Sequence, residues 1–261
     1  METGRVLSSL TKFRELQVQG RRPSVQAGLR IYAIGDIHGR LDLLNEMLAR
    51  IRADIEARPA TRPVYVFLGD YIDRGPRSRE TIDRLIEHGA ASESIFLKGN
   101  HELIAIKCLS DRGLFDQWLR LGGLQTLVSY GIPPDGLTKG KQIVEMQWAF
   151  HSALPQAHFR FFRDLVNSFT CGDFFFAHAG ARPNVELSQQ KESDLLWIRE
   201  EFLSSDFDFG KIIVHGHTPS DEIDVGPNRI NIDTGAFATG RLSCLVIEGE
   251  ALSVIETSAA P

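Results

Sequence analysis

The chain has 261 residues, of which 43% are hydrophobic and 24% are charged, the balance of a soluble globular protein that can bury a sizeable core. Its formal net charge of −5 argues against nucleic acid as a partner. Its three cysteines lie far apart, which argues against a disulfide scaffold or a zinc–thiolate site. Residues 1–29 hold no apolar run of signal-peptide length and no segment reaches the length of a membrane span, so we expect a cytoplasmic protein without a membrane partner.

The chain begins with a mixed, polar stretch over residues 1–29, which we interpret as a loosely ordered lead-in. Apolar residues 31–34 then predict a short strand, which ends in the turn G-D-I-H-G with Asp36 and His38. Between residues 40 and 57, leucine and isoleucine recur every three or four residues, and this spacing predicts an amphipathic helix.

The same order of strand, polar turn and helix follows twice more. Apolar residues 64–68 predict a second strand that ends in G-D-Y-I-D-R-G-P, and a helix is expected over 77–88. Residues 95–97 predict a third strand, which ends in K-G-N-H-E. This order is typical of a mostly parallel sheet, whose ligands bind beyond the carboxyl ends of the strands. We therefore expect the three polar turns to lie on one edge and to form one site.

The second half of the chain changes in character. Residues 103–170 carry helical patterns, and we interpret them as a helical insertion beside the sheet edge that selects the substrate. A further helix is expected over 195–202. Later strands are predicted at 174–177, 212–214, 229–232, 242–247 and 251–255. Because these strands alternate less with helices, we expect a second, mixed sheet packed on the first.

Polar side chains gather where five of the predicted strands end. They are Asp36 and His38, then Asp70, Asp73 and Arg74, then Asn100 and His101, then His178, and finally His215 and His217. Each turn alone has an ordinary interpretation, since Asp70 could form a turn, Asn100 could cap a helix and His178 could be a core residue. Five such turns on one edge instead favour a metal site, whose oxygen and nitrogen ligands suit manganese, iron or zinc.

Taken in order, the polar turns form a recognisable series. The motifs are G-D-I-H-G at 35–39, G-D-Y-I-D-R-G at 69–75, G-N-H-E at 99–102, H-A-G at 178–180 and G-H-T at 216–218. This series resembles that of the calcineurin-like metallophosphoesterases and, more narrowly, that of the PPP-type serine/threonine phosphatases of bacteria and phages. The resemblance implies an α/β fold over residues 30–261, a two-sheet β-sandwich flanked by helices (αββα) with a helical insertion at about 103–170.

The resemblance also implies a centre of two divalent cations, with manganese expected first and iron or zinc as alternatives. Asp36 and His38 would hold the first cation, Asp70 would bridge both, and the second would be held by Asn100, His178 and His217. His215 would face the same side of a strand as His217, so it either supports the site or is a structural residue. The other histidines match no motif and are interpreted as surface or packing residues: His88, His151 and His158.

The residue types fit phosphoester hydrolysis. A hydroxide between two divalent cations is a nucleophile at neutral pH, and the cations neutralise charge on the phosphate oxygens. His101 resembles the family's general acid, and Asp73 would orient its ring. The phosphate would be contacted by Arg74, Arg199 and Asn100, since arginine offers a planar fork for its oxygens. Arg199 has an alternative interpretation as an ordinary exposed arginine on a helix.

The remaining question at this point is the substrate. Asp73 and Glu102 favour a protein phosphatase, because the symmetrical diadenosine tetraphosphatases usually differ at both positions. Gly75 and Pro76 are shared with that nucleotide branch and weigh the other way. Pro219 stands where related nucleases have a further ligand histidine, which disfavours a nuclease. We expect a metal-dependent phosphomonoesterase that acts on phosphoserine or phosphothreonine proteins.

Two alternatives stay open beside this expectation. One is a symmetrical bis(5'-nucleosyl)-tetraphosphatase or another nucleotide phosphohydrolase. The other is a pseudo-phosphatase that only binds phosphorylated partners, and it is disfavoured because it would have lost at least one metal ligand while all six are present. The sequence carries no indication of the oligomeric state.

Overall fold

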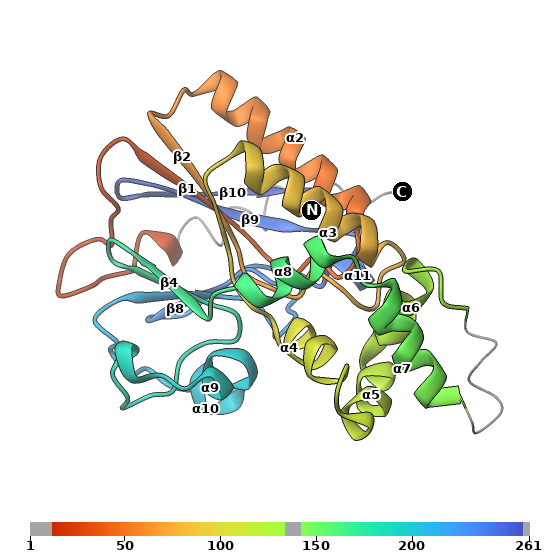
Figure 1. Cartoon of the computed structure of the whole chain (residues 1–261). Helices are drawn as coiled ribbons and strands as arrows, with labels where there is room; N and C mark the ends of the chain where they lie inside the picture. Colours follow the sequence, from red (N-terminus) through yellow and green to blue (C-terminus); the bar gives the residue numbers. More distant parts are fainter. Residues whose placement is uncertain (1–11, 134–141, 258–261) are drawn as a thin grey trace.

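The computed structural model describes residues 12–133 and 142–257, and two five-stranded β-sheets form its centre (Figure 1). The first sheet has the order β10-β9-β1-β2-β3, with β1 at Leu29–Ile34, β2 at Arg62–Phe67, β3 at Ser94–Phe96, β9 at Ser243–Glu248 and β10 at Ala251–Glu256. The second has the order β4-β5-β6-β8-β7, with β4 at Ser168–Cys171, β5 at Phe174–Ala177, β6 at Ile212–His215, β7 at Asp224–Val225 and β8 at Arg229–Asn231.

Helices flank the two sheets on both sides. The first sheet is covered by α2 (Leu41–Ala57) and α3 (Ser78–Ala91), and the second by α9 (Glu192–Trp197) and α10 (Glu200–Leu203) (Figure 1). The insertion contains α4 (Asn100–Lys107), α5 (Arg112–Trp118), α6 (Leu124–Ser129), α7 (Gln142–Ala153) and α8 (Gln156–Asp164), and a last short helix, α11, spans Ala236–Thr239. This arrangement confirms the expected αββα sandwich with a helical insertion.

The alternation of side chains along β1 explains why the sheets stack in this way. Ile31 and Ala33 point into the layer between the two sheets, where they join Phe176 and Val214 of the second sheet in one buried cluster. Tyr32 lies on the opposite face, in the cluster that the first sheet forms with α2, α3 and the insertion. Because successive strand residues face opposite sides, an uninterrupted apolar strand needs a partner on each side.

The third apolar cluster lies on the outer face of the second sheet. Phe175 and Ile213 pack there against Leu195 and Phe202 of the α9–α10 segment. The middle residues of β5 and β6 therefore divide between two cores. This division leaves the carboxyl ends of both strands, with their polar turns, at the edge of the sandwich.

The parallel arrangement of the first three strands is confirmed, but the later strands differ from the prediction. β1 pairs in parallel with β2, and β2 with β3. β9 pairs antiparallel with β1, and β10 antiparallel with β9, so both extend the first sheet rather than the second. The strand β4, which pairs antiparallel with β5, overlaps the end of the range 103–170, where helices are expected from the sequence.

The helix expected over residues 195–202 is interrupted. α9 ends at Trp197, Ile198 is extended, and Arg199 has φ −133° and ψ −108° before α10 begins. Ile198 is buried in the cluster on the outer face of the second sheet. The apolar spacing predicted the two helical turns, but their packing on the sheet separates them at this residue.

The part of the lead-in that the structure describes, residues 12–29, is attached to the sandwich more firmly than we expected. Phe13, Leu16 and Val25 are buried in the cluster between the sheets. Arg21 forms a bidentate ion pair with Asp173, with nitrogen–oxygen distances of 2.5 and 2.7 Å. Residues 1–11 of the lead-in and 134–141 of the insertion lie outside the described residues. A helix of the length and apolarity needed to cross a bilayer is not found among those described.

Candidate metal centre

The polar turns of the two sheets meet at one end of the sandwich, and the backbone there is unusual. Seven non-glycine residues of the described chain have positive φ, and five of them belong to these turns: His38 (47°), Asp70 (52°), Asp73 (71°), Arg74 (66°) and His217 (66°). Such conformations cost free energy and persist only where the surroundings hold them, as they often do at functional sites. Strand β6 ends at His215, so His217 lies beyond it and the two do not share one strand face as we expected.

One buried carboxylate holds two of these turns together. The side chain of Glu102 accepts hydrogen bonds from the backbone N–H groups of Asp70 (2.9 Å), Tyr71 (2.8 Å) and Gly99 (3.0 Å). Burial, and after it the charge of Asp70, raises the pKa of Glu102 to about 7. Glu102 thus fixes the turn after β2 against the start of α4. Its carboxylate is bound by backbone N–H groups and is not among the candidate metal ligands.

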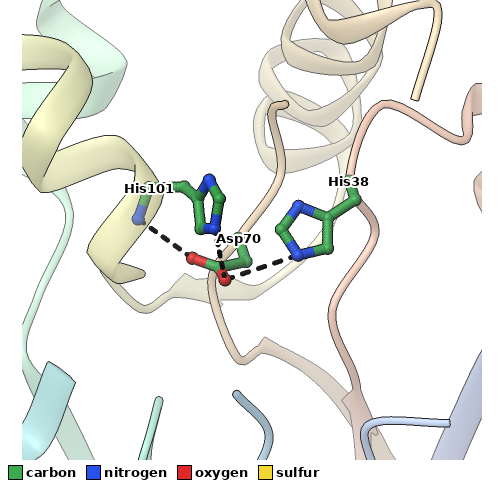
Figure 2. A group of neighbouring side chains, drawn as sticks. All are labelled: His38, Asp70 and His101. Atoms are coloured by element: carbon green, nitrogen blue, oxygen red, sulfur yellow. Dashed lines mark hydrogen bonds and ion pairs between the residues drawn. The ribbon is translucent and has the colours of Figure 1, made fainter. Parts of the chain in front are cut away.

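The first group of candidate ligands gathers around Asp70. Nε2 of His38 lies 3.5 Å and Nε2 of His101 lies 3.8 Å from Oδ2 of Asp70 (Figure 2). All three side chains are at most 2% exposed. They are close enough for one cation to reach all of them.

The second group shares the same carboxylate. Nε2 of His178 lies 3.4 Å from Oδ1 of Asp70. Oδ1 of Asn100 lies 2.9 Å from Nε2 of His178 and 3.0 Å from Nδ1 of His217. Asp70, His178 and His217 form the other set that could hold a cation. Asp70 is therefore the one side chain common to both groups, which is the place expected of a bridging ligand.

The hydrogen bonds of the histidines show which ring nitrogens are free to bind a cation. Nδ1 of His38 lies 2.8 Å from the carbonyl of Ile72, and Nδ1 of His178 lies 2.9 Å from that of Leu68. A carbonyl only accepts, so both Nδ1 atoms carry a proton and the Nε2 atoms are the ones that face Asp70. A backbone carbonyl that fixes the tautomer in this way is the usual support of a metal-binding histidine.

The protonation of the rings fits the same interpretation. Burial lowers the pKa of His38 to about 3, and burial followed by the charge of His178 lowers that of His217 to about 2, so both rings are neutral. Burial also acts to lower the pKa of His178, but the charges of Asp70 and Asp36 outweigh it and raise this pKa to about 10. Without a cation, a proton occupies the position at which the ring faces the carboxylates, and metal binding would displace it.

Asp36 has a buried carboxylate oxygen without a hydrogen-bond partner in the described chain, as a cation ligand would. Its Oδ2 accepts a hydrogen bond of 3.1 Å from the backbone N–H of His217, whereas its buried Oδ1 has no partner in the described chain. Burial and the neighbouring charge of Asp233 hold the pKa of Asp36 well above its usual range. Buried carboxylates that repel one another are unfavourable even with the charge of His178 nearby, and a divalent cation would reduce this penalty. The residues present thus fit a metal centre.

His101 is the member of the first group whose ring is also held from the other side. Its Nδ1 donates a hydrogen bond of 2.7 Å to Asp73, whose carboxylate also accepts from Trp118 (2.8 Å) and Thr126 (2.6 Å). Nε2 of His101 lies 3.1 Å from Nη2 of Arg74. The contact between Asp73 and His101 that we predicted is present, and Trp118 and Thr126 of the insertion support it.

Two further predicted residues have different surroundings. Arg199 is exposed at the junction of α9 and α10, and its charge is among those that lower the pKa of His217, after burial and His178. His215 lies away from the ligand groups: its Nδ1 lies 3.1 Å from the carbonyl of Gly216, and its ring packs edge-on against Phe202. Of the two interpretations left open for His215, these contacts favour the structural residue.

The sequence interpretation missed one buried carboxylate at the centre. Asp233 follows β8 and is 3% exposed, and its Oδ1 accepts a hydrogen bond of 2.9 Å from the backbone N–H of Gly235. Burial raises its pKa to about 6. The pattern that identified the other turns, a polar residue directly after a predicted strand, is present here too, since Asp233 follows the strand predicted at 229–232.

A family model of the calcineurin-like phosphoesterases matches residues 29–242 of the chain, which include both ligand groups. The chain belongs to this family. The phosphoesterase is 27% identical to the asymmetrical bis(5'-nucleosyl)-tetraphosphatase PrpE of Anoxybacillus flavithermus, over 86% of this chain and 93% of that protein. It is 26% identical to serine/threonine-protein phosphatase 2 of Escherichia coli, over 82% of this chain and 90% of the relative.

Solved structures support the same fold for the phosphoesterase. It is similar to a crystal structure of a putative diadenosine tetraphosphatase, with a TM-score of 0.58 and 18% identity, over 92% of this chain and 100% of the other. The family and these relatives make the protein a hydrolase that acts on phosphoester bonds. The relatives differ in substrate, so the comparisons agree on the chemistry more closely than on the molecule that is cleaved.

Proposed function

We propose that the phosphoesterase is a metal-dependent phosphomonoesterase that removes phosphate from phosphoserine or phosphothreonine in proteins. Asp36, His38 and Asp70 would hold one divalent cation, and a second would be held by Asp70 together with Asn100, His178 and His217. The pair of cations, manganese in the first place, would supply a nucleophilic water-derived oxygen and neutralise charge on the phosphate. The observation that carries this proposal is the position of Asp70 between the two groups.

The other predicted residues would handle the leaving group and the phosphate. His101 would donate the proton to the departing serine or threonine oxygen, because Asp73 holds its Nδ1 and leaves Nε2 facing Asp70. Arg74, within 3.1 Å of His101, would bind phosphate oxygens with its planar guanidinium group. Arg199 would add a second positive charge from the α9–α10 junction, and Asn100 would contact the phosphate beside the second cation.

A nucleotide substrate is the second candidate, and the similarity to PrpE favours it. The two residues that pointed toward a protein substrate, Asp73 and Glu102, are both at most 1% exposed and bind protein groups. They would therefore act on the catalytic groups rather than touch the substrate. Preference for a phosphoprotein rests on the resemblance of the motifs, and its place of action in the cytoplasm remains a prediction from the sequence.

Parallel turnover of two substrates tests the proposal. The manganese-loaded protein would be assayed on a phosphoserine peptide and on diadenosine tetraphosphate, with the His101→Asn variant as the matched control. We expect the higher kcat/KM on the peptide and a strong loss in the variant. A higher kcat/KM on the dinucleotide would replace the proposed substrate by the second candidate, and hydrolysis of neither would contradict both.

A further inference from the structure

An aromatic ring lies directly against the arginine that would bind the phosphate. Phe237, on the short helix α11, has its ring centroid 4.7 Å from Cζ of Arg74. Phe237 is 37% exposed, which places it among the exposed large apolar residues of the described chain. α11 follows the turn that carries Asp233, so the ring is brought to the centre by the second sheet while Arg74 comes from the first.

Arg74 is held at its backbone as well. Its N–H donates a hydrogen bond of 3.1 Å to the carbonyl of Gly122 in the insertion. A Cβ on Gly122 would lie 2.8 Å from Cγ of Arg74, so only glycine leaves room for the arginine side chain to pass. The insertion therefore positions the backbone and stem of Arg74, and the guanidinium group beyond them contacts the ring of Phe237 and Nε2 of His101.

The two contacts of the Arg74 guanidinium group differ in whether they can persist during the reaction. In the proposed reaction His101 would donate the proton of Nε2 to the leaving oxygen, so Nε2 must turn from Arg74 toward the substrate once substrate is bound. The ring of Phe237 takes no part in proton transfer and can keep its contact. A guanidinium group over an aromatic face is attracted by the negative charge of that face, which an aliphatic side chain of similar size lacks.

We propose that Phe237 is a positioning residue that holds the guanidinium group of Arg74 toward the phosphate. This inference rests on the proposed phosphate-binding role of Arg74. Phe237 also packs edge-on against His38, with ring centroids 5.4 Å apart, so one side chain links a candidate metal ligand to the phosphate arginine. Replacement by leucine keeps apolar volume beside His38 and removes the aromatic face, whereas tyrosine keeps both.

Titration calorimetry with inorganic phosphate tests the inference without relying on turnover. The manganese-loaded wild-type protein would be compared with Phe237→Leu and Phe237→Tyr, and with Trp148→Leu, which removes an exposed ring from α7 in the insertion. We expect leucine at position 237 to weaken phosphate binding by about threefold to thirtyfold, the range of a cation–π contact. Tyrosine is expected to restore wild-type affinity, and Trp148→Leu to leave it unchanged.

A double-mutant cycle decides whether the effect passes through the arginine. In an Arg74→Gln background the leucine substitution is expected to have no further effect on phosphate affinity. An unchanged affinity in Phe237→Leu, an equal loss in the Arg74→Gln background, or loss of manganese from the leucine variant would each overturn the inference. The proposed function fails on a different result, the absence of phosphoester hydrolysis by the wild-type protein.

Discussion

Nδ1 of His101 lies 2.7 Å from Oδ2 of Asp73, and both side chains are at most 1% exposed. Because a carboxylate only accepts, this contact places a proton on Nδ1 and directs Nε2 toward Asp70 and Arg74. Burial acts to lower the pKa of His101, but Asp70 and Asp73 outweigh it and raise this pKa, which favours the second proton on Nε2 that a donor needs. Trp118 donates to the same carboxylate oxygen. The ring is therefore oriented by the helical insertion as well as by the turn after β2.

The first prediction concerns His101 as the proton donor. Asparagine at this position keeps a polar side chain but cannot give a proton to a departing alkoxide. We expect kcat on a phosphoserine peptide to fall by about 100- to 10,000-fold, with a much smaller loss on an aryl phosphate whose leaving group needs no proton. Metal content, measured by elemental analysis, should stay at the wild-type level. Full activity of His101→Asn on the phosphoserine peptide would rule out this assignment.

The second prediction concerns Glu102 as the support of the Asp70 turn. Alanine would leave several buried N–H groups without an acceptor, those of Asp70, Tyr71 and Gly99 among them. We expect a loss of about 3–5 kcal/mol in unfolding free energy and a weaker affinity for manganese. The matched control is Glu56→Ala, an exposed glutamate on α2. Chemical denaturation and metal titration measure both effects, and equal values for the two variants would contradict the role of Glu102.

The third prediction concerns acid sensitivity at His88, on α3. Burial, and after it the charges of Arg84 and Arg52, lowers the pKa of His88 to about 4, below the ordinary value of about 6.5. The folded state therefore favours the neutral ring, so its contribution to stability is present above pH 6.5 and is lost as the pH falls toward 4.

Replacement of His88 by phenylalanine removes this ionisation and keeps a ring beside Tyr65, whose centroid lies 4.4 Å away. Urea unfolding at pH 7 and at pH 4.5 measures the loss for each protein. We expect the wild-type protein to lose more stability between these values than His88→Phe, by on the order of 1–2 kcal/mol after allowance for screening by water. An equal loss in both proteins would show that His88 does not titrate as described.

Much of this architecture could be predicted because the relevant signals are local. Period and length of the apolar runs predicted the strands at 31–34 and 64–68 and the helix between them, and the parallel order placed their polar ends on one edge. The contacts of Asp70 with His38 and His178 confirm that the turns of both sheets meet there.

The remainder depends on contacts between distant segments, which local patterns do not carry. β9 and β10 extend the first sheet because β9 pairs with β1, more than two hundred residues earlier in the chain. The break at Arg199 follows from packing on the second sheet. In the sequence Glu102 is an ordinary acidic residue near a helix start. Its role becomes visible only in the structure, where the backbone of the Asp70 turn donates a hydrogen bond to it. The proposed role of Phe237 likewise depends on its contact with Arg74, which follows a strand of the other sheet.

The most direct measurement of the central claim is the metal content of the manganese-reconstituted protein and of its Asp70→Asn variant. An amide at this position keeps the shape of the carboxylate but removes the charge that both ligand groups share. We expect two manganese ions per chain in the wild-type protein and loss of bound metal, together with activity, in the variant. A full pair of ions in Asp70→Asn, or a wild-type protein that binds none, would contradict it.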